Sequence, residues 1–255
     1  MKIYVCIKSV PDSAAAIKIL DTNRFDENIT FIINPYDEHA IEEAVRLRSA
    51  AEKAEVIAVS VGKAGAVNSL QSALAMGVDR AIHIVTASAA DSFVTALALK
   101  EAILADGQPD IIFTGKQSID SEGFQTMFRL GAALDIPVAT NVAAFSLQGR
   151  SVTVESEMEA GGRVVLRMPL PCIIGAGKAL NKPRYPTLPD IRKARTKPIQ
   201  TISLNSLDLQ TPSAGMEILE LRPAVEKRRG YVIQGSGESA VSELIRLLRE
   251  EAKVI

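Results

Sequence analysis

Four short apolar runs, separated by helix-like segments, constrain the fold of this chain more than any other feature. The runs are rich in β-branched residues and nearly continuous rather than alternating, which is typical of strands buried on both faces of a sheet. They span residues 2–8, 55–61, 80–85 and 110–114. Between them, apolar side chains recur at helical spacing. These helical patterns cover residues 37–52 and 66–76 and the segment around Val94, Leu97 and Ala98.

This alternation of strands and helices predicts an α/β fold with a doubly wound, mainly parallel sheet. Such sheets bind nucleotides beyond the carboxyl ends of their strands. From residue 144 the turn pairs Gln148-Gly149 and Gly161-Gly162 separate alternating runs, which favours antiparallel strands. A strand over 172–176 then closes a core domain, which we expect to span residues 1–185.

The remainder, residues 186–255, is expected to be an extended C-terminal arm that ends in a helix. Prolines gather over 181–235 without a long apolar period, so this segment does not supply a second hydrophobic core. Residues 238–252 have a helical apolar stripe that needs a surface to pack against. The stripe consists of Val241, Leu244, Ile245 and Leu248.

Charge and cysteine content narrow the classes of partner and compartment. The chain has 29 Lys+Arg against 30 Asp+Glu, so it lacks the basic excess that nucleic-acid binding requires. Cys6 and Cys172 form neither a C-x-x-C pair nor a disulfide framework, which favours a reducing compartment such as the cytoplasm. The N-terminal apolar run is interrupted by Lys8 and stopped by Pro11, which predicts neither a secretory signal nor membrane insertion.

The sequence contains no complete motif for a common catalytic or nucleotide-hydrolysing site. It has no G-x-x-x-x-G-K-[ST] loop, no complete G-x-G-x-x-G and no G-x-S-x-G. Its two histidines, His39 and His83, are too few for a histidine metal site or a Ser/His triad. The acidic pair Glu42-Glu43 is interpreted as a solvated helix face. We therefore expect no catalytic residue and no metal site.

Residues 110–126 are the most informative for binding. A buried strand leads into a glycine and then into a hydroxyl-rich segment, interpreted as a helix start, with Ser118, Ser121 and Thr126. Backbone N–H groups at such a helix N-terminus would receive a phosphate. The alternative is an ordinary helix cap by Ser121. The turn over 60–67 would let a backbone approach an adenine closely, or else is a flexible connection.

Several segments carry a resemblance that covers essentially the whole chain. They are KIYVCIKSVPD (2–12), NPYDEHAIEEAVRLR (34–48), ALAMGVDRAIHI (73–84), GKQSIDSEGFQT (115–126) and, most distinctive, LNKPRYPTLPDIRKARTKPI (180–199). Together they resemble the β (small) subunit of electron-transfer flavoproteins, the FixA-type family. The resemblance implies an adenine-nucleotide-binding, HUP-like core.

Members of that family form a heterodimer with an α subunit that holds most of a shared FAD. They pass electrons from acyl-CoA or similar dehydrogenases, as in fatty acid β-oxidation, to a membrane quinone oxidoreductase. The resemblance therefore implies an electron carrier subunit rather than an enzyme, because the redox chemistry belongs to the flavin. It also implies that the arm and the final helix wrap the α subunit.

The usual family members hold a structural AMP in the β core. Carried over to this chain, the AMP contacts are Cys6 and Val61 through backbone, with Asn34, Gly115, Gln117, Ser118, Asp120, Gln125 and Thr126. In an electron-bifurcating branch a second FAD takes this place. Residues 10–13 and 33–37 lean toward that branch, whereas residues 38–47 and the Gln125-Thr126 pair lean toward AMP, which we favour.

Two further expectations concern the segment after residue 180 and an alternative function. Leu180 corresponds to the leucine that family members insert into a pocket of the dehydrogenase, and its neighbours would form the polar rim of that contact. The docking residues are Leu180, Asn181, Pro183, Arg184 and Tyr185.

The alternative function for the whole chain is that of a stand-alone adenine-nucleotide-binding protein of the stress-protein type, which explains the core but not residues 180–255.

Overall fold

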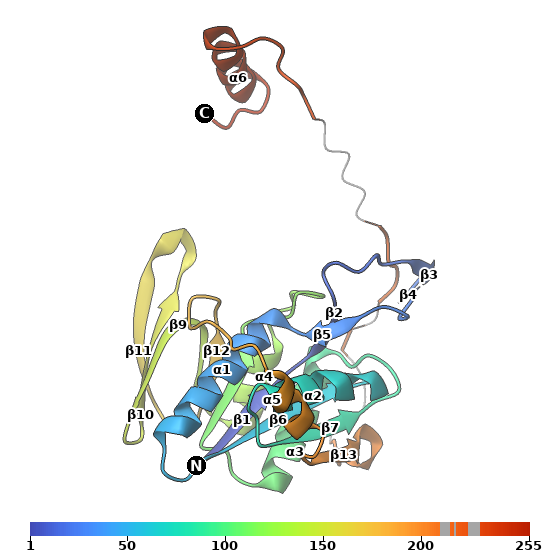
Figure 1. Ribbon diagram of the computed structural model, residues 1–255, viewed down its shortest axis with the longest axis vertical. Helices are drawn as coiled ribbons and strands as arrows, with labels where there is room; N and C mark the ends of the chain where they lie inside the picture. The colour runs from blue at the N-terminus through green and yellow to red at the C-terminus, as the bar shows by residue number, and fades with distance from the viewer. Residues whose placement is uncertain (210–214, 217, 224–229) are drawn as a thin grey trace. The chain divides into compact units, whose positions relative to one another are not determined.

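The computed structural model describes residues 1–209, 215–216, 218–223 and 230–255. The chain divides into two compact units, Met1–Leu219 and Glu220–Ile255. The first unit is an α/β structure built on a nine-stranded sheet (Figure 1). The predicted fold class is therefore confirmed.

Most of the sheet is parallel, and one end is an antiparallel meander. Strands β9, β12, β8, β1, β6, β7 and β13 lie side by side in this order and pair in parallel. Strands β10 and β11 extend the β9 side with antiparallel pairing. The bounds are β1 Lys2–Cys6, β6 Glu55–Gly62, β7 Arg80–Val85, β8 Ile111–Gly115, β9 Val138–Gln148, β10 Ser151–Glu157, β11 Arg163–Pro169, β12 Cys172–Ala176 and β13 Ile199–Ser203.

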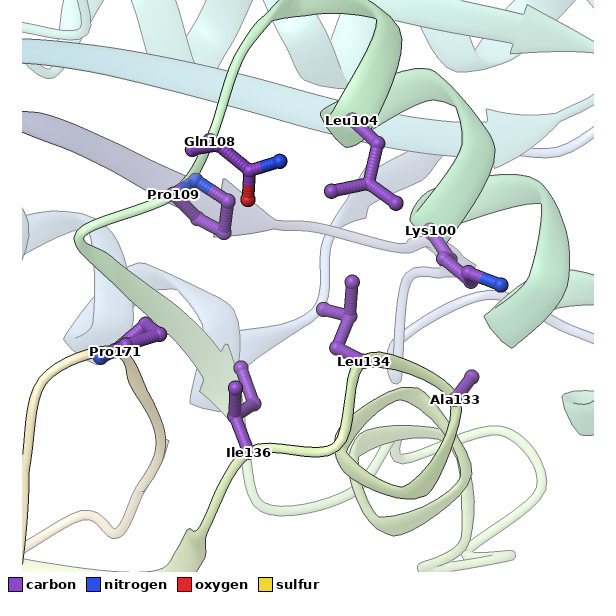
Figure 2. Close-up of a pocket in the computed structure, with 8 residues that line it drawn as sticks. All are labelled: Lys100, Leu104, Gln108, Pro109, Ala133, Leu134, Ile136 and Pro171. Carbon is purple, nitrogen blue, oxygen red and sulfur yellow. The ribbon is translucent and has the colours of Figure 1, made fainter.

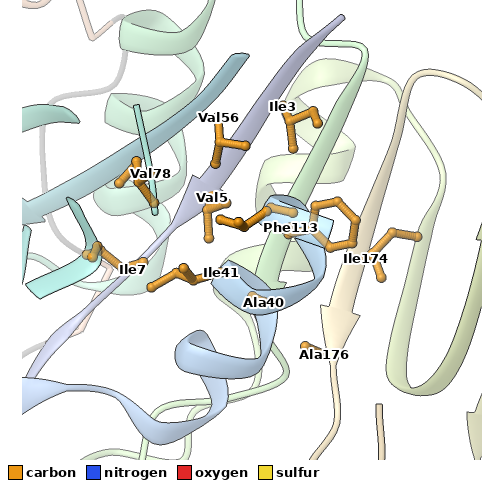
Figure 3. Close-up of a cluster of buried hydrophobic side chains, with 14 of the residues drawn as sticks. Ile3, Val5, Ile7, Ala40, Ile41, Val56, Val78, Phe113, Ile174 and Ala176 are labelled. Atoms are coloured by element: carbon orange, nitrogen blue, oxygen red, sulfur yellow. The ribbon is translucent and has the colours of Figure 1, made fainter. Parts of the chain in front are cut away.

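Helices cover both faces of the parallel strands, so the apolar runs are buried on both sides as predicted. On β1, Ile3 and Val5 pack with Ile41 of α1 on one face (Figure 3), whereas Tyr4 packs with Ile103 of α3 on the other. Helices α1, α2 and α5 lie on the first face, and α3 and α4 lie on the second. The bounds are α1 Pro35–Ala50, α2 Val67–Ala75, α3 Ser92–Asp106, α4 Thr126–Leu134 and α5 Leu188–Ala194.

The structure differs from the sequence prediction after residue 185. Helix α5 and strand β13 belong to the first unit, which continues to Leu219. On β13, Ile199 packs against the core on one face and Ile202 on the other. The Lys197 ammonium donates to the Leu74 carbonyl at the end of α2, 2.9 Å away. A half-exposed edge strand with two apolar residues has too short an apolar period to be recognised as part of a core.

The antiparallel strands are confirmed, with turns at the two predicted pairs, although β9 begins at Val138 rather than near residue 144. Small elements surround the sheet: β2 Ser9–Pro11 pairs with β5 Phe31–Ile33, β3 Ile19–Asp21 pairs with β4 Arg24–Phe25, and short 3-10 turns cover Ala64–Ala66, Glu159–Gly161 and Leu204–Ser206. In the second unit, helix α6 spans Glu238–Glu250 and has no buried residue.

An ion-pair network lies at the edge of the sheet where the parallel strands begin, which we call the amino edge; the strands end at the carboxyl edge. The Arg80 guanidinium lies 2.8 and 2.7 Å from the two Asp106 carboxylate oxygens, and it also pairs with Glu55 at 2.8 Å. The Tyr4 hydroxyl donates to Asp106 at 2.7 Å. The opposite, carboxyl edge is the one at which doubly wound sheets bind ligands.

Candidate functional site

Three of the predicted binding residues end neighbouring strands at the carboxyl edge. Cys6 is the last residue of β1, Val61 lies at the end of β6, and Gly115 is the last residue of β8. Because β1 pairs with β6 on one side and with β8 on the other, the fold brings these strand ends together. This is the edge at which doubly wound sheets bind ligands.

A buried carboxylate ties the loops at this edge to α1. Asp37, in the first turn of α1, is 5% exposed and accepts three hydrogen bonds. The donors are the Lys8 backbone N–H at 2.7 Å, the Asn34 side-chain amide at 2.9 Å and the Gly115 backbone N–H at 3.0 Å. A β-carbon at Gly115 would overlap the Asp37 carboxylate, so this approach requires glycine. We call Asp37 and Asn34 the latch.

In Asn34, the second residue of the latch, both the amide nitrogen and the carbonyl oxygen of the side chain form hydrogen bonds within the protein. It is 1% exposed, and besides its bond to Asp37 its amide donates to the Gln117 carbonyl at 2.8 Å. Its carbonyl oxygen accepts from the Ile119 backbone N–H at 3.1 Å. In the structure these bonds of Asn34, which was predicted to bind the nucleotide, hold the 115–119 loop.

The latch carboxylate has an unusual acidity because of its position. Burial raises the pKa of Asp37 to about 7, and the donors from Asn34, Lys8 and Gly115 oppose this shift. Without these donors an ionised carboxylate would be strongly disfavoured there. The loops at the carboxyl edge are thus held by a group that titrates near neutral pH.

The next turn gathers a lysine, two hydroxyls and a carboxylate. The Ser118 and Ser121 hydroxyl oxygens are 2.9 Å apart. The Lys8 ammonium lies 2.7 Å from Asp120, 3.3 Å from Ser118 and 3.4 Å from Ser121. Sequence reasoning missed Lys8, although its place as the last residue of the predicted run 2–8 was a signal that could have found it. We call Lys8, Ser118, Asp120 and Ser121 the loop cluster.

The predicted helix start is displaced. Helix α4 begins at Thr126 with Gln125 as its N-cap residue, so Ser118 and Ser121 lie in a preceding turn and Ser121 is not the cap. The Gln125 side-chain carbonyl accepts from the Ser92 hydroxyl at 3.3 Å and from Arg129 at 2.9 Å. Gln125 therefore links the beginnings of α3 and α4, and Thr126 is half-buried beside it.

The predicted docking segment is held against α1 by charged and polar side chains. The Arg184 guanidinium pairs with both Glu42 carboxylate oxygens, at 2.7 and 3.0 Å. The Asn181 amide donates to the His39 carbonyl at 2.9 Å and to Glu43 at 2.9 Å. Glu42 was expected on a solvated face, but it is 4% exposed. Although burial opposes ionisation, Arg184 holds the pKa of Glu42 below its usual range.

The apolar side chains of this segment are unequally exposed. Leu180 is half-buried and packs against the main core, and Pro183 is also half-buried. Tyr185 and Leu188 are 89% and 73% exposed. The segment thus presents two exposed apolar side chains beside a leucine that is partly covered.

The described residues contain no arrangement typical of metal or thiolate chemistry. No group of three or more His, Cys, Asp or Glu side chains is placed to hold a metal ion in this part of the chain. Cys6 and Cys172 are free, and burial raises the pKa of both thiols to about 12, which disfavours the reactive thiolate.

A hollow of about 280 Å³ lies away from the carboxyl edge. Its lining joins α3 to the end of α4 and includes Leu104, Gln108 and Leu134 (Figure 2). The lining is mostly apolar, and none of the predicted binding residues lines it. It is therefore not the site described above.

The comparisons with known proteins all identify electron transfer flavoproteins, and the relatives align with the whole chain. The family model described as "Electron transfer flavoprotein domain" matches residues 22–207. The mitochondrial electron transfer flavoprotein subunit beta of Arabidopsis thaliana is 38% identical over 260 residues, covering 100% of both chains. The corresponding Bacillus subtilis subunit is 34% identical over 261 residues, again covering 100% of both chains. The Syntrophomonas wolfei subunit is 33% identical, covering 100% of this chain and 98% of its own.

The family model thus matches well over half of the chain, and the relatives align with its full length, including the segments before and after the matched domain. The chain therefore belongs to the electron transfer flavoprotein β-subunit family.

Proposed function

We propose that this chain pairs with an α subunit in a heterodimeric electron transfer flavoprotein. The heterodimer would accept electrons from acyl-CoA or similar dehydrogenases and pass them to a membrane quinone oxidoreductase. The observation that carries the proposal is the full-length similarity to β subunits, because it includes residues 186–255. A stand-alone stress-type protein does not need those residues, so we do not retain that alternative.

The shared FAD would be held mainly by the α subunit, and when bound it supplies the redox chemistry. This chain's part is to shape the binding surface and to position the partners. The apolar stripe of α6 and the segment 186–219 are the parts we assign to contact with the α subunit. The half-buried Leu180, with Asn181, Pro183, Arg184 and Tyr185, is assigned to docking of the dehydrogenase.

A structural AMP is proposed for the carboxyl edge. We assign the backbone groups of Cys6 and Val61, at the ends of β1 and β6, to contact with the adenine. The loop cluster offers hydroxyl and ammonium donors suited to a phosphate. Ionised Asp120 is suited to accept a hydrogen bond from a ribose hydroxyl. Asn34 acts through the latch, and Gly115 permits the close approach of Asp37.

A second FAD in place of AMP is the alternative that the sequence keeps open, because residues 10–13 and 33–37 lean toward the bifurcating branch. Its adenylate end presents the same adenine and phosphate chemistry to the same loops.

We also propose a cytoplasmic location, on the ground that both cysteines are free. None of the helices in the described residues is long and apolar enough to cross a membrane.

Nucleotide counting tests the proposal. The chain is co-expressed with an α subunit from the same source, the complex is purified and denatured, and the released nucleotides are quantified by chromatography. One FAD and one AMP per heterodimer is the expected result. Two FAD and no AMP would replace the AMP site by the second-FAD alternative. Failure to form a complex with any such α subunit would contradict the proposed function.

A further inference from the structure

We propose that Lys8 is the cationic ligand of the nucleotide phosphate at the carboxyl edge. The group it recognises is a phosphate ester on an adenosine, as in AMP or in the adenylate end of FAD. The inference deepens the proposed function and rests on it. It adds a binding residue from the loop after β1, whereas the expected phosphate contacts come from the loop after β8.

The backbone of Lys8 is fixed on both sides. Its N–H donates to the buried Asp37 carboxylate at 2.7 Å, and its carbonyl accepts from the Asn34 backbone N–H at 2.9 Å. The side chain therefore leaves from a point that the latch holds in place. A lysine held in this way loses less conformational freedom when it binds an anion than a lysine on a mobile loop.

The side chain spans from the loop after β1 to the loop after β8. Its ammonium reaches Asp120, Ser118 and Ser121 within hydrogen-bond distance, at 2.7 to 3.4 Å. The Lys8 side chain is 46% exposed, so an incoming anion has access to it. The two hydroxyls and the ammonium together supply the donors that a phosphate requires.

The charge of Asp120 makes a cation necessary at this place. Although burial opposes it, the Lys8 ammonium and the two serine hydroxyls hold the pKa of Asp120 below its usual range, so this carboxylate is ionised at neutral pH. A phosphate bound at the hydroxyls would meet that negative charge. In the described part of the chain, Lys8 is the cation that pairs with Asp120. Lys8 thus offsets a repulsion that would otherwise oppose the phosphate.

The test compares AMP with adenosine, which lacks the phosphate. Heterodimers carrying Lys8→Met or Lys178→Met are freed of bound nucleotide, and both ligands are titrated by calorimetry. Lys178 is an exposed lysine just beyond β12 at the same edge, so it controls for the lost charge. We expect Lys8→Met to weaken AMP about tenfold, as for the loss of one charge-assisted hydrogen bond. Adenosine should change less than about twofold, and Lys178→Met should leave both affinities near wild type.

The other outcomes distinguish failure of the Lys8 proposal from failure of the proposed nucleotide site. Equal weakening of AMP and adenosine would make Lys8 a structural residue without a phosphate contact. Unchanged AMP affinity would remove it from the site. If the wild-type complex binds neither AMP nor adenosine but takes up FAD, the comparison is repeated with FAD, which Lys8→Met must then weaken. If wild type binds none of the three, the proposed nucleotide site fails first, and the role of Lys8 falls with it.

Discussion

At the scale of single residues, the latch carboxylate Asp37 couples the carboxyl edge to pH. Its oxygens accept from a side-chain amide and from two backbone N–H groups, that of Lys8 after β1 and that of Gly115 at the end of β8. The ionised form satisfies all three donors, whereas burial favours the protonated form. The balance between these two effects places the titration near neutrality.

Asp37→Asn should therefore change the pH dependence of stability. The folded pKa of Asp37 is about 7, above its value of about 3.9 in an unfolded chain. A raised folded pKa contributes stability that is full below the unfolded pKa and is lost as pH rises through the folded one. The free energy of unfolding of the wild type, relative to Asp37→Asn, should thus fall between about pH 4 and pH 7, by up to about 1.4 kcal/mol per pH unit, and should level off above pH 7.

Urea unfolding of both proteins at half-unit pH steps measures this difference. Asp12→Asn provides a matched control, because Asp12 lies in the loop after β2 and outside the latch. A difference that stays level from pH 4 to pH 7 would mean that Asp37 is ionised throughout and that the three donors outweigh burial.

The burial of two acidic residues of α1, Asp37 and Glu42, could not be predicted from the sequence. Glu42 was interpreted as a solvated surface residue, and the helical pattern over 37–52 gave no indication that Asp37 is buried. Their positions along α1 carry no sign of Gly115 or Arg184, the partners that bury them. A residue's environment depends on chain segments far away in sequence, and a local pattern does not contain them.

At the scale of elements, the segment after β12 is fixed to α1 by an ion pair and also carries apolar side chains that a partner could bind. Glu42 and Arg184 fix the segment to α1, while Tyr185 and Leu188 remain exposed. Leu180, the leucine predicted to insert into the dehydrogenase pocket, packs against the core and is partly buried. Leu180 and the exposed Leu188 are therefore the two leucines that could insert into a dehydrogenase pocket.

Leu180→Ala and Leu188→Ala distinguish these candidates. If Leu180 is the anchor, its truncation should slow dehydrogenase-dependent reduction of the flavin at least about tenfold, as loss of a central apolar contact does. Leu188→Ala should then have little effect. Because Leu180 is half-buried, its truncation should also cost about 1–2 kcal/mol of stability.

Stopped-flow reduction by the dehydrogenase measures the transfer, and reduction by dithionite together with flavin content serves as the control for an intact complex. A larger effect from Leu188→Ala would move the anchor to the exposed group. Slowing of both the enzymatic and the chemical reduction would point to a damaged complex instead of a lost contact.

The elements that the sequence predicts well are those with a strong apolar period. The strands β1, β6, β7 and β8 are almost wholly apolar because helices cover both faces, and their runs were visible without a structure. Strand β13 is an edge strand with one apolar residue on each face, so its register beside β7 depends on pairing that no local pattern encodes. The same reason hid the continuation of the first unit to Leu219.

At the scale of the whole molecule, the chain separates what it needs for folding from what it presents to a partner. In the described residues, every buried hydrophobic side chain lies at or before Ala194. The second unit contains α6, whose apolar stripe consists of Val241, Leu244, Ile245 and Leu248, and none of the residues of α6 is buried. Folding of the first unit should therefore not depend on the second, whereas assembly with the α subunit should.

A chain that ends at Leu219 tests this separation. Its thermal midpoint should lie within about 3 °C of the full chain, because removing no buried core residue costs less than about 1 kcal/mol. It should fail to co-purify with the α subunit. In the full chain, Leu244→Asp should weaken assembly by placing a charge in the stripe, while Ser242→Asp, outside the stripe, should not. A truncated chain that still forms the heterodimer would assign assembly to residues 1–219, and one that unfolds far below the full chain would make the second unit part of the fold.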